Sequence, residues 1–208
     1  MNKDRTRLIA SISIAFVLWT LMFSPWTKDL IPFWYAMTGS AIILIALSWR
    51  KVRGLLHFHW TDILLGIAIA TVLWGVFWVG DKVSQWIFPS FARPQVDAIY
   101  SMKEGMNPVV ISLLLLFVIG PAEELFWRAY VQRSLSQWTE KALFGAVVAV
   151  GIYAFVHVFS LNLMLILAAG VCGVIWGGLY YFFPQRLGAL ILSHALWDAA
   201  VFIWFPIL

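Results

Sequence analysis

Cysteine and charge are scarce in this chain of 208 residues. Its single cysteine, Cys172, excludes an intramolecular disulfide, so disulfides give no information on the redox compartment. Asp, Glu, Lys and Arg make up only 12% of the residues, whereas 62% are hydrophobic and the mean hydropathy is +0.89. Ordinary soluble domains do not have this composition. The chain is therefore expected to be an integral membrane protein whose partner is the lipid bilayer.

A basic patch is also missing. The net charge is +4, but the basic residues form short clusters at the ends of apolar runs. Such clusters are typical of membrane topology signals. We therefore expect no nucleic-acid partner.

Seven apolar runs are long enough to cross a bilayer, which takes about 20 helical residues. They are approximately 8–24, 30–49, 62–80, 108–131, 141–160, 162–183 and 187–207. No internal repeat and no long linker divides them. The sequence thus predicts an all-α, polytopic transmembrane bundle of about seven to eight helices. It should form one membrane-embedded domain, 1–208, with the motif-bearing core at about 108–208.

The basic clusters predict the orientation of the helices. The first cluster resembles the basic region of a signal peptide, but no small-residue cleavage site follows it, so the first run should remain a membrane helix. By the positive-inside rule all clusters share the cytoplasmic side, which predicts a multi-pass protein with a cytoplasmic N-terminus. The expected location is a bacterial or archaeal cell membrane. The clusters are Lys3, Arg5 and Arg7; Arg50, Lys51 and Arg53; Arg133 and Lys141; and Arg186.

The segment 81–107 is the only sizeable stretch expected outside the bilayer. Its apolar residues before Pro89 fit an interfacial helix broken at that proline, but a plain loop is an equal alternative.

Two adjacent carboxylates, Glu123 and Glu124, interrupt the run 108–131, and Arg128 follows one helical turn later. An ionisable group near the middle of a membrane helix costs about 2.5–3.5 kcal/mol on insertion scales, so it persists where it lines a polar cavity or is paired. Glu124 and Arg128 are four residues apart and can form an ion pair. Glu123 points about 100° away around the helix and stays free. The pattern predicts a functional Glu123 beside a structural pair, against the alternative that the charges only tie helices together.

Three more ionisable groups lie in the late apolar runs: His157, His194 and Asp198. His194 and Asp198 are four residues apart, so the carboxylate can hold the imidazole in one orientation. Tyr153 lies one turn before His157, on the same helix face. A lone intramembrane histidine is commonly a core residue, but two histidines with three carboxylates favour a catalytic site.

Three short motifs therefore carry the chemistry of the late runs. They are Glu123-Glu124-xxx-Arg128, Tyr153-xxx-His157 and His194-xxx-Asp198. Together they resemble the CAAX-protease and bacteriocin-processing family, the Abi or Rce1-like intramembrane proteases. The resemblance implies a helical bundle that cleaves peptide bonds of membrane-anchored or lipid-modified protein or peptide substrates.

The resemblance also implies a mechanism in which a water is activated for hydrolysis. Glu123, alone or with His157, would take the proton of the water, and His194 would stabilise the oxyanion. The chain departs from the common pattern at Tyr153, where Phe is usual, which should affect packing only. It departs again at Asp198, where Asn is more frequent. An ionised carboxylate cannot donate to an oxyanion, so Asp198 is either protonated or, as we prefer, orients His194 while His194 makes the donation.

A zinc site is the rival interpretation. Glu123, His157 and His194 would match the ligand set of many catalytic zinc sites, with a fourth position open for water. However, the HExxH spacing is missing, and the resemblance implies a glutamate-dependent site. We therefore expect no cofactor.

Two other function classes fit the same residues. One is a non-enzymatic immunity or scaffolding protein on this fold, although a binding protein would not need a free Glu123. The other is a proton-coupled transporter, but no inverted repeat supports it.

The depths of two residues do not agree if the helices are straight. Glu123 would lie about 10 Å from the cytoplasmic end of its span at about 1.5 Å per residue, while His157 would lie near the far end of the next span. Either Gly120-Pro121 breaks the first of these helices, or the predicted boundary near residues 160–162 is misplaced.

Overall fold

The computed structural model describes residues 3–207, so positions 1, 2 and 208 of the predicted domain lie outside the described residues. This part of the chain is helical and contains no strand. The helices of its first half are α1 (Lys3–Phe23), α2 (Phe33–Val52), α3 (Trp60–Ile87) and α4 (Pro89–Tyr100). Those of its second half are α5 (Pro108–Leu114), α6 (Gly120–Glu124), α7 (Arg133–Thr139), α8 (Ala142–Phe155), α9 (Leu163–Phe182) and α10 (Leu187–Ala199). The prediction of an all-α polytopic bundle is confirmed.

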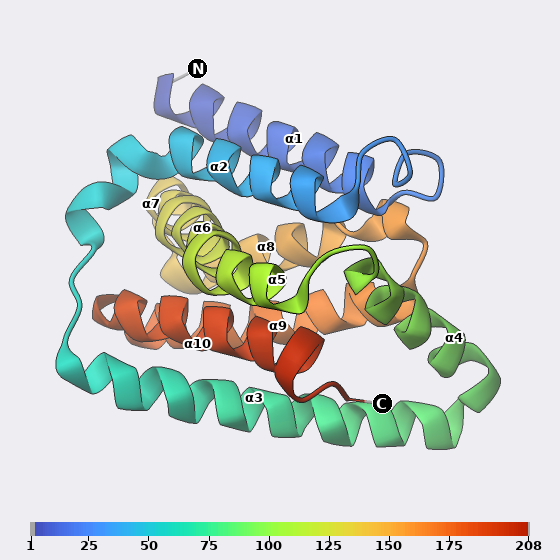
Figure 1. Ribbon diagram of the computed structural model, residues 1–208. Coiled ribbons are helices and arrows are strands. Elements are labelled where there is room, and N and C mark those ends of the chain that lie inside the picture. Colours follow the sequence, from blue (N-terminus) through green and yellow to red (C-terminus); the bar gives the residue numbers. More distant parts are fainter. Residues whose placement is uncertain (1–2, 208) are drawn as a thin grey trace.

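Within residues 3–207, six helices are long and apolar enough to cross a membrane. They are Lys3–Phe23, Trp60–Ile87, Pro108–Thr139, Ala142–Ser160, Leu163–Phe182 and Pro184–Trp204. Each overlaps one of the predicted runs. The remaining run, 30–49, corresponds to α2, which is 20 residues long and lies alongside α1 in the bundle (Figure 1) but is not among the six.

The helix from Pro108 to Thr139 is continuous, but two of its segments are wound as π-helix. The π-helical segments η3 (Leu115–Ile119) and η4 (Leu125–Gln132) lie on either side of α6. Gly120 has ordinary helical angles, φ −55° and ψ −48°, so the predicted break at Gly120-Pro121 does not occur. Pro121 has no N–H to bond within the helix, and the wider π turn directly precedes it. The acidic pair thus lies on a short α-helical turn between two π segments.

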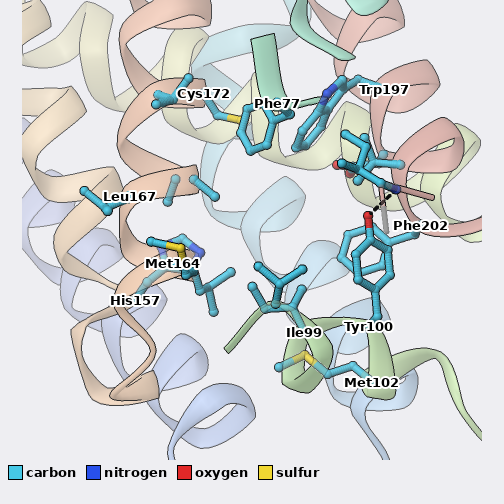
Figure 2. A pocket seen from close by; sticks show the side chains of 18 of the residues that line it. Phe77, Ile99, Tyr100, Met102, His157, Met164, Leu167, Cys172, Trp197 and Phe202 are labelled. Atoms are coloured by element: carbon cyan, nitrogen blue, oxygen red, sulfur yellow. Dashed lines mark hydrogen bonds between the residues drawn. The ribbon is translucent and has the colours of Figure 1, made fainter. Parts of the chain in front are cut away.

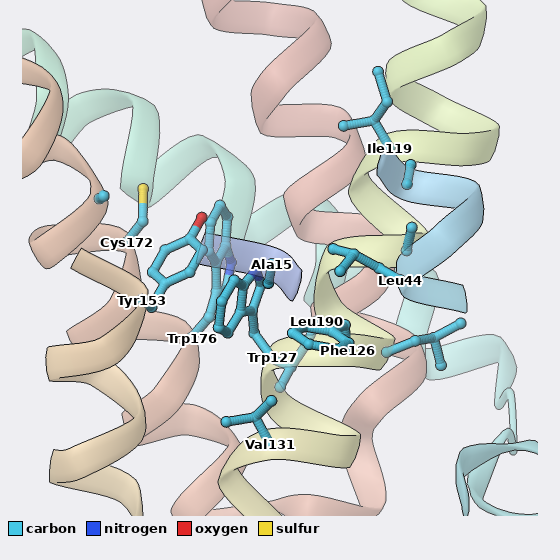
Figure 3. Packing of buried hydrophobic residues seen from close by; sticks show 14 of the residues in the cluster. Ala15, Leu44, Ile119, Phe126, Trp127, Val131, Tyr153, Cys172, Trp176 and Leu190 are labelled. Atoms are coloured by element: carbon cyan, nitrogen blue, oxygen red, sulfur yellow. The ribbon is translucent and has the colours of Figure 1, made fainter. Parts of the chain in front are cut away.

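The helix ends that carry the basic clusters gather at one end of the bundle, near the start of α1, the end of α2 and the starts of α3 and α10 (Figure 1). The other end holds α4, the α1–α2 connection and the C-terminal residues. Aromatic side chains fill the space between the helices, as Figure 3 shows for Trp127, Tyr153 and Trp176. The rings of Trp127 and Tyr153 meet edge to face, with centroids 5.3 Å apart.

Of the two alternatives for residues 81–107, the structure has the helix. α3 continues to Ile87, and α4 begins directly at Pro89, so the break at this proline is where the sequence placed it. Gln95 fixes α4 to the turn between α8 and α9. Its backbone oxygen accepts from Asn162 Nδ2 at 2.8 Å, and its side-chain oxygen accepts from the Met164 N–H at 3.1 Å. These bonds hold α4 across one end of the bundle.

Candidate active site

The acidic pair is buried on α6. Glu123 is 6% exposed and Glu124 is fully buried. Glu124 Oε1 lies 3.2 Å from Arg128 Nη1, as an ion-pair contact rather than an aligned hydrogen bond. The Arg128 guanidinium also lies over two aromatic rings, 4.6 Å from the centroid of Tyr153 and 5.5 Å from that of Trp176. The aromatic faces and the carboxylate together compensate the buried cation.

Gly120 lets α10 approach this pair. A Cβ atom at Gly120 would lie only 2.7 Å from the Cα of Ala195, which no side chain tolerates without a shift of the helices. His194 directly precedes Ala195. The close approach of the two backbones therefore places the imidazole beside the acidic pair.

His194 lies between two carboxylates. Its Nδ1 is 2.7 Å from Glu124 Oε1, and its Nε2 is 3.5 Å from Asp198 Oδ2. The imidazole stacks on Trp176, with centroids 3.8 Å apart and planes inclined by 16°. The sequence predicted that Asp198 orients His194 and that Glu124 pairs with Arg128. In the structure Glu124 also contacts His194, and more closely than Asp198 does. Residue spacing along one helix reveals contacts within that helix, and the contact between Glu124 and His194 joins two helices.

Tyr153 does more than pack. Its hydroxyl donates to Glu123 Oε2 at 3.2 Å, and no other described residue hydrogen-bonds this carboxylate. No ion pair to Glu123 forms among the described residues, as predicted, but the carboxylate does have this hydrogen-bond partner, and the view that Tyr in place of Phe affects packing alone is wrong. The phenol ring does contact His157 as expected, with centroids 5.7 Å apart.

Both ring nitrogens of His157 are occupied. Trp19 Nε1 donates to Nε2 at 3.0 Å, and Nδ1 lies 3.0 Å from the backbone oxygen of Tyr153. Because Nε2 accepts the indole N–H, the proton of a neutral ring is on Nδ1 and is donated to the carbonyl. Trp19 of α1 lies outside the predicted motif-bearing core, 108–208, and still contacts a residue of the site. A tryptophan inside an apolar run gives no signal of charge or spacing.

The difference in depth between Glu123 and His157 is resolved by the end of the helix that carries Glu123. This helix continues to Thr139, past the predicted end at residue 131, and α8 begins at Ala142. Glu123 and His157 therefore lie at nearly equal distances along the chain from the turn that joins the two helices, and so at similar depth. α8 itself ends at Phe155, five residues before the predicted boundary, so His157 lies in the turn that follows. Tyr153 reaches Glu123 with its hydroxyl and His157 with its backbone oxygen. The end of the Glu123 helix at Thr139, and neither a break at Gly120-Pro121 nor the boundary near residues 160–162, accounts for the disagreement.

Glu123, His157, His194 and Asp198 all line one cavity of about 480 Å³. Most of its wall is apolar and comes from both halves of the chain. Figure 2 shows Phe77, Trp197 and Phe202 on one side and His157, Met164 and Leu167 on the other. α3 and α4 contribute to the wall at the end of the bundle away from the basic clusters. The arrangement offers a carboxylate and an imidazole to a ligand held in apolar surroundings.

The arrangement does not fit the rival zinc site. Within residues 3–207, no group of three or more His, Cys, Asp or Glu side chains is placed to hold a metal ion. In addition, the Nε2 lone pair of His157 already accepts the hydrogen bond from Trp19. The three residues considered as ligands line one cavity without forming a ligand shell.

The motif residues lie in the part of the chain that matches a known family. Residues 105–200 match the family model of the type II CAAX prenyl endopeptidases, Rce1-like. The resemblance to the CAAX-protease and bacteriocin-processing family is confirmed. The CAAX-protease match indicates a multi-pass membrane endopeptidase in general. It spans α5 to α10 and leaves α1 to α4 outside. No curated protein and no solved structure matches the chain.

Proposed function

We propose that the chain is an intramembrane endopeptidase in which Glu123 activates the attacking water. The carboxylate lines the cavity, and Tyr153 is its one hydrogen-bond partner among the described residues, so it can still accept a proton from water. The water oxygen would bond to the carbonyl carbon of the scissile peptide while Glu123 takes the proton. Glu123 would then return this proton to the amide nitrogen as the C–N bond breaks. His157 does not share this step while Trp19 occupies its Nε2.

His194 supports the second half of the mechanism, the stabilisation of the oxyanion. Its Nδ1 is held by Glu124 at 2.7 Å, which fixes the plane of the ring. Its Nε2 is 3.5 Å from Asp198, longer than a good hydrogen bond, so an Nε2 proton remains free to be donated to the oxyanion. Asp198 would keep that proton on Nε2 between turnovers. Glu124 therefore acts as a positioning residue as well as the partner of Arg128.

The apolar wall of the cavity supports a substrate that reaches the site within the bilayer. We propose a membrane-anchored or lipid-modified protein or peptide, which would lie against Phe77, Trp197 and Phe202. The substrate would enter from the end of the bundle that carries α4. If the basic clusters face the cytoplasm and the N-terminus is cytoplasmic, this is the opposite side of the membrane.

One observation carries the proposal of an enzyme. Glu123 and the pair His194–Asp198 come from separate helices and converge on one apolar cavity. A scaffolding or immunity protein does not require a carboxylate and an imidazole to face a shared space. A transporter would require a polar route across the membrane, whereas this cavity is mostly apolar.

The test compares the intact chain with Glu123→Gln in its native membrane. Glu123→Gln keeps the shape and the hydrogen bond acceptor but removes the base. We expect uncut membrane proteins to accumulate, seen as changed termini in mass spectrometry. Glu104→Gln, a change in the exposed segment after α4, is the matched control and should behave as the unmodified chain. Full cleavage by Glu123→Gln at normal expression would contradict the proposal.

A further inference from the structure

The cavity has a second polar end, formed by α3 and α4. Asp81 and Ser84 of α3 line it together with Tyr100 of α4. Figure 2 shows Tyr100 beside Phe202, where its hydroxyl accepts the backbone N–H of Ile207. Burial raises the pKa of this hydroxyl, and the nearby Asp81 carboxylate adds to the rise. This end of the cavity therefore combines a carboxylate with a neutral phenol.

The two carboxylate oxygens of Asp81 have different surroundings. Oδ2 accepts from Gln85 Nε2 at 2.7 Å and lies 3.4 Å from Lys82 Nζ. Oδ1 is buried and has no hydrogen-bond partner, and the side chain as a whole is only 7% exposed. Ser84 does not satisfy it, because its hydroxyl donates to the backbone oxygen of Asp81. A role limited to holding Gln85 and Lys82 uses Oδ2 and leaves Oδ1 unexplained.

We propose that Asp81 binds a cationic group of the substrate, an ammonium or guanidinium on a lysine or arginine side chain. The wall around it is apolar, with Phe77, Ile99 and Phe202 among its residues, and Asp81 is the one charged side chain among the described residues that line this end; Lys82 lies outside the lining and is 47% exposed. A cation would supply the hydrogen bond that Oδ1 lacks, and charge-assisted bonds are strong where water is scarce. The inference rests on the proposed function, because it takes the cavity as the binding site of the substrate.

The binding test does not depend on proteolysis, since Cys172 reports on occupancy. It is the only cysteine of the chain, it is buried, and it lines the same cavity. Purified full-length protein in a non-ionic detergent is mixed with dodecylammonium or with dodecan-1-ol, two probes of equal length that differ in charge. Occupancy is read by protection of Cys172 from N-ethylmaleimide and by the rise in the thermal unfolding midpoint.

We expect dodecylammonium to bind at about tenfold lower concentration than the alcohol, the scale of a charge-assisted hydrogen bond. Asp81→Asn should reduce this difference to about twofold or less. Asp97→Asn is the matched control, because it removes a charge from the exposed face of α4 outside the cavity lining, and the tenfold preference should remain.

Three outcomes would overturn the inference: equal binding of both probes by the unmodified protein, a preference that survives in Asp81→Asn, or its loss in Asp97→Asn. If Asp81→Asn does not fold, Glu123→Gln and Asp198→Asn take its place, because both carboxylates line the same cavity: a preference kept in both assigns the cation to Asp81, and its loss in either overturns the inference. A preference that is confirmed in a protein without proteolytic activity would refute the proposed function and leave the cation site standing.

Discussion

Tyr153→Phe removes a single oxygen atom from the site, the hydroxyl that donates to Glu123. We expect this change to slow peptide cleavage about tenfold through kcat, with KM little changed. The ring remains, so its contacts with Arg128, Trp127 and His157 should be retained. The backbone oxygen that holds His157 is unaffected as well.

The magnitude follows from the geometry of this bond. A hydrogen bond to a charged group contributes about 1.5–3 kcal/mol. The distance of 3.2 Å between Tyr153 Oη and Glu123 Oε2 is long for an O–H···O bond, so the lower limit applies. Since about 1.4 kcal/mol corresponds to a tenfold change in rate, losing the orientation of Glu123 should cost about one order of magnitude.

The assay measures kcat and KM on one membrane-anchored peptide reporter in vesicles. Tyr130→Phe is the matched control: Tyr130 is equally buried, and its hydroxyl contacts Ser11 at 3.4 Å, away from the cavity lining. It should cleave at the rate of the unmodified protein. Thermal unfolding of both variants shows whether the fold is affected.

Two results would refute the reasoning. If Tyr153→Phe and Tyr130→Phe have the same kcat, the hydroxyl does not position Glu123. If Tyr153→Phe instead raises KM at constant kcat, Tyr153 contacts the substrate and the assignment to Glu123 is wrong.

Three further predictions concern the other groups of the site. Arg128→Gln should destabilise the fold by about 3–5 kcal/mol, because it breaks a buried ion pair and leaves the Glu124 carboxylate with His194 as its remaining polar partner; thermal unfolding at or above the midpoint of Glu123→Gln would contradict this. Asp198→Asn should keep substantial activity, whereas Asp198→Ala should lose about 10²-fold, the scale of an oxyanion-hole group; reporter kinetics with the opposite order would reject the role of Asp198. Exhaustive chelation should leave cleavage unchanged, and elemental analysis that finds one zinc per chain, lost and restored together with activity, would overturn the metal-free mechanism.

The membrane-spanning helices could be predicted from the sequence because apolar length is a local property. The same holds for the contact between Glu124 and Arg128, which depends on helical spacing alone. The end of α8 could not be placed, since Val156, Val158 and Phe159 continue the apolar run past Phe155. The end of the helix that carries Glu123 was also misplaced, at 131 instead of Thr139, and this error caused the apparent difference in depth between Glu123 and His157.

The contacts between helices are a different kind of information. Nothing near Trp19 in the sequence indicates that its indole reaches His157, which is 138 residues away. The contact of His194 with Glu124 likewise depends on the close approach of two helices at Gly120. Motifs in the sequence therefore predict which groups can react. Only the packing of the bundle shows which side chains contact His157 and His194.

The early and the later helices contribute different kinds of residue to the cavity. The segment that matches the CAAX proteases, 105–200, contains Glu123, His194 and Asp198, the groups proposed for the chemistry. Trp19 and Asp81 lie outside that segment, yet both line the same cavity. If the later helices perform the hydrolysis, the earlier ones control the space in front of it: Trp19 occupies the free lone pair of His157, and Asp81 sets the charge that the cavity accepts. Changes in α1 and α3 should then alter which substrates are cut, while changes in α6 and α10 should alter whether cleavage occurs at all.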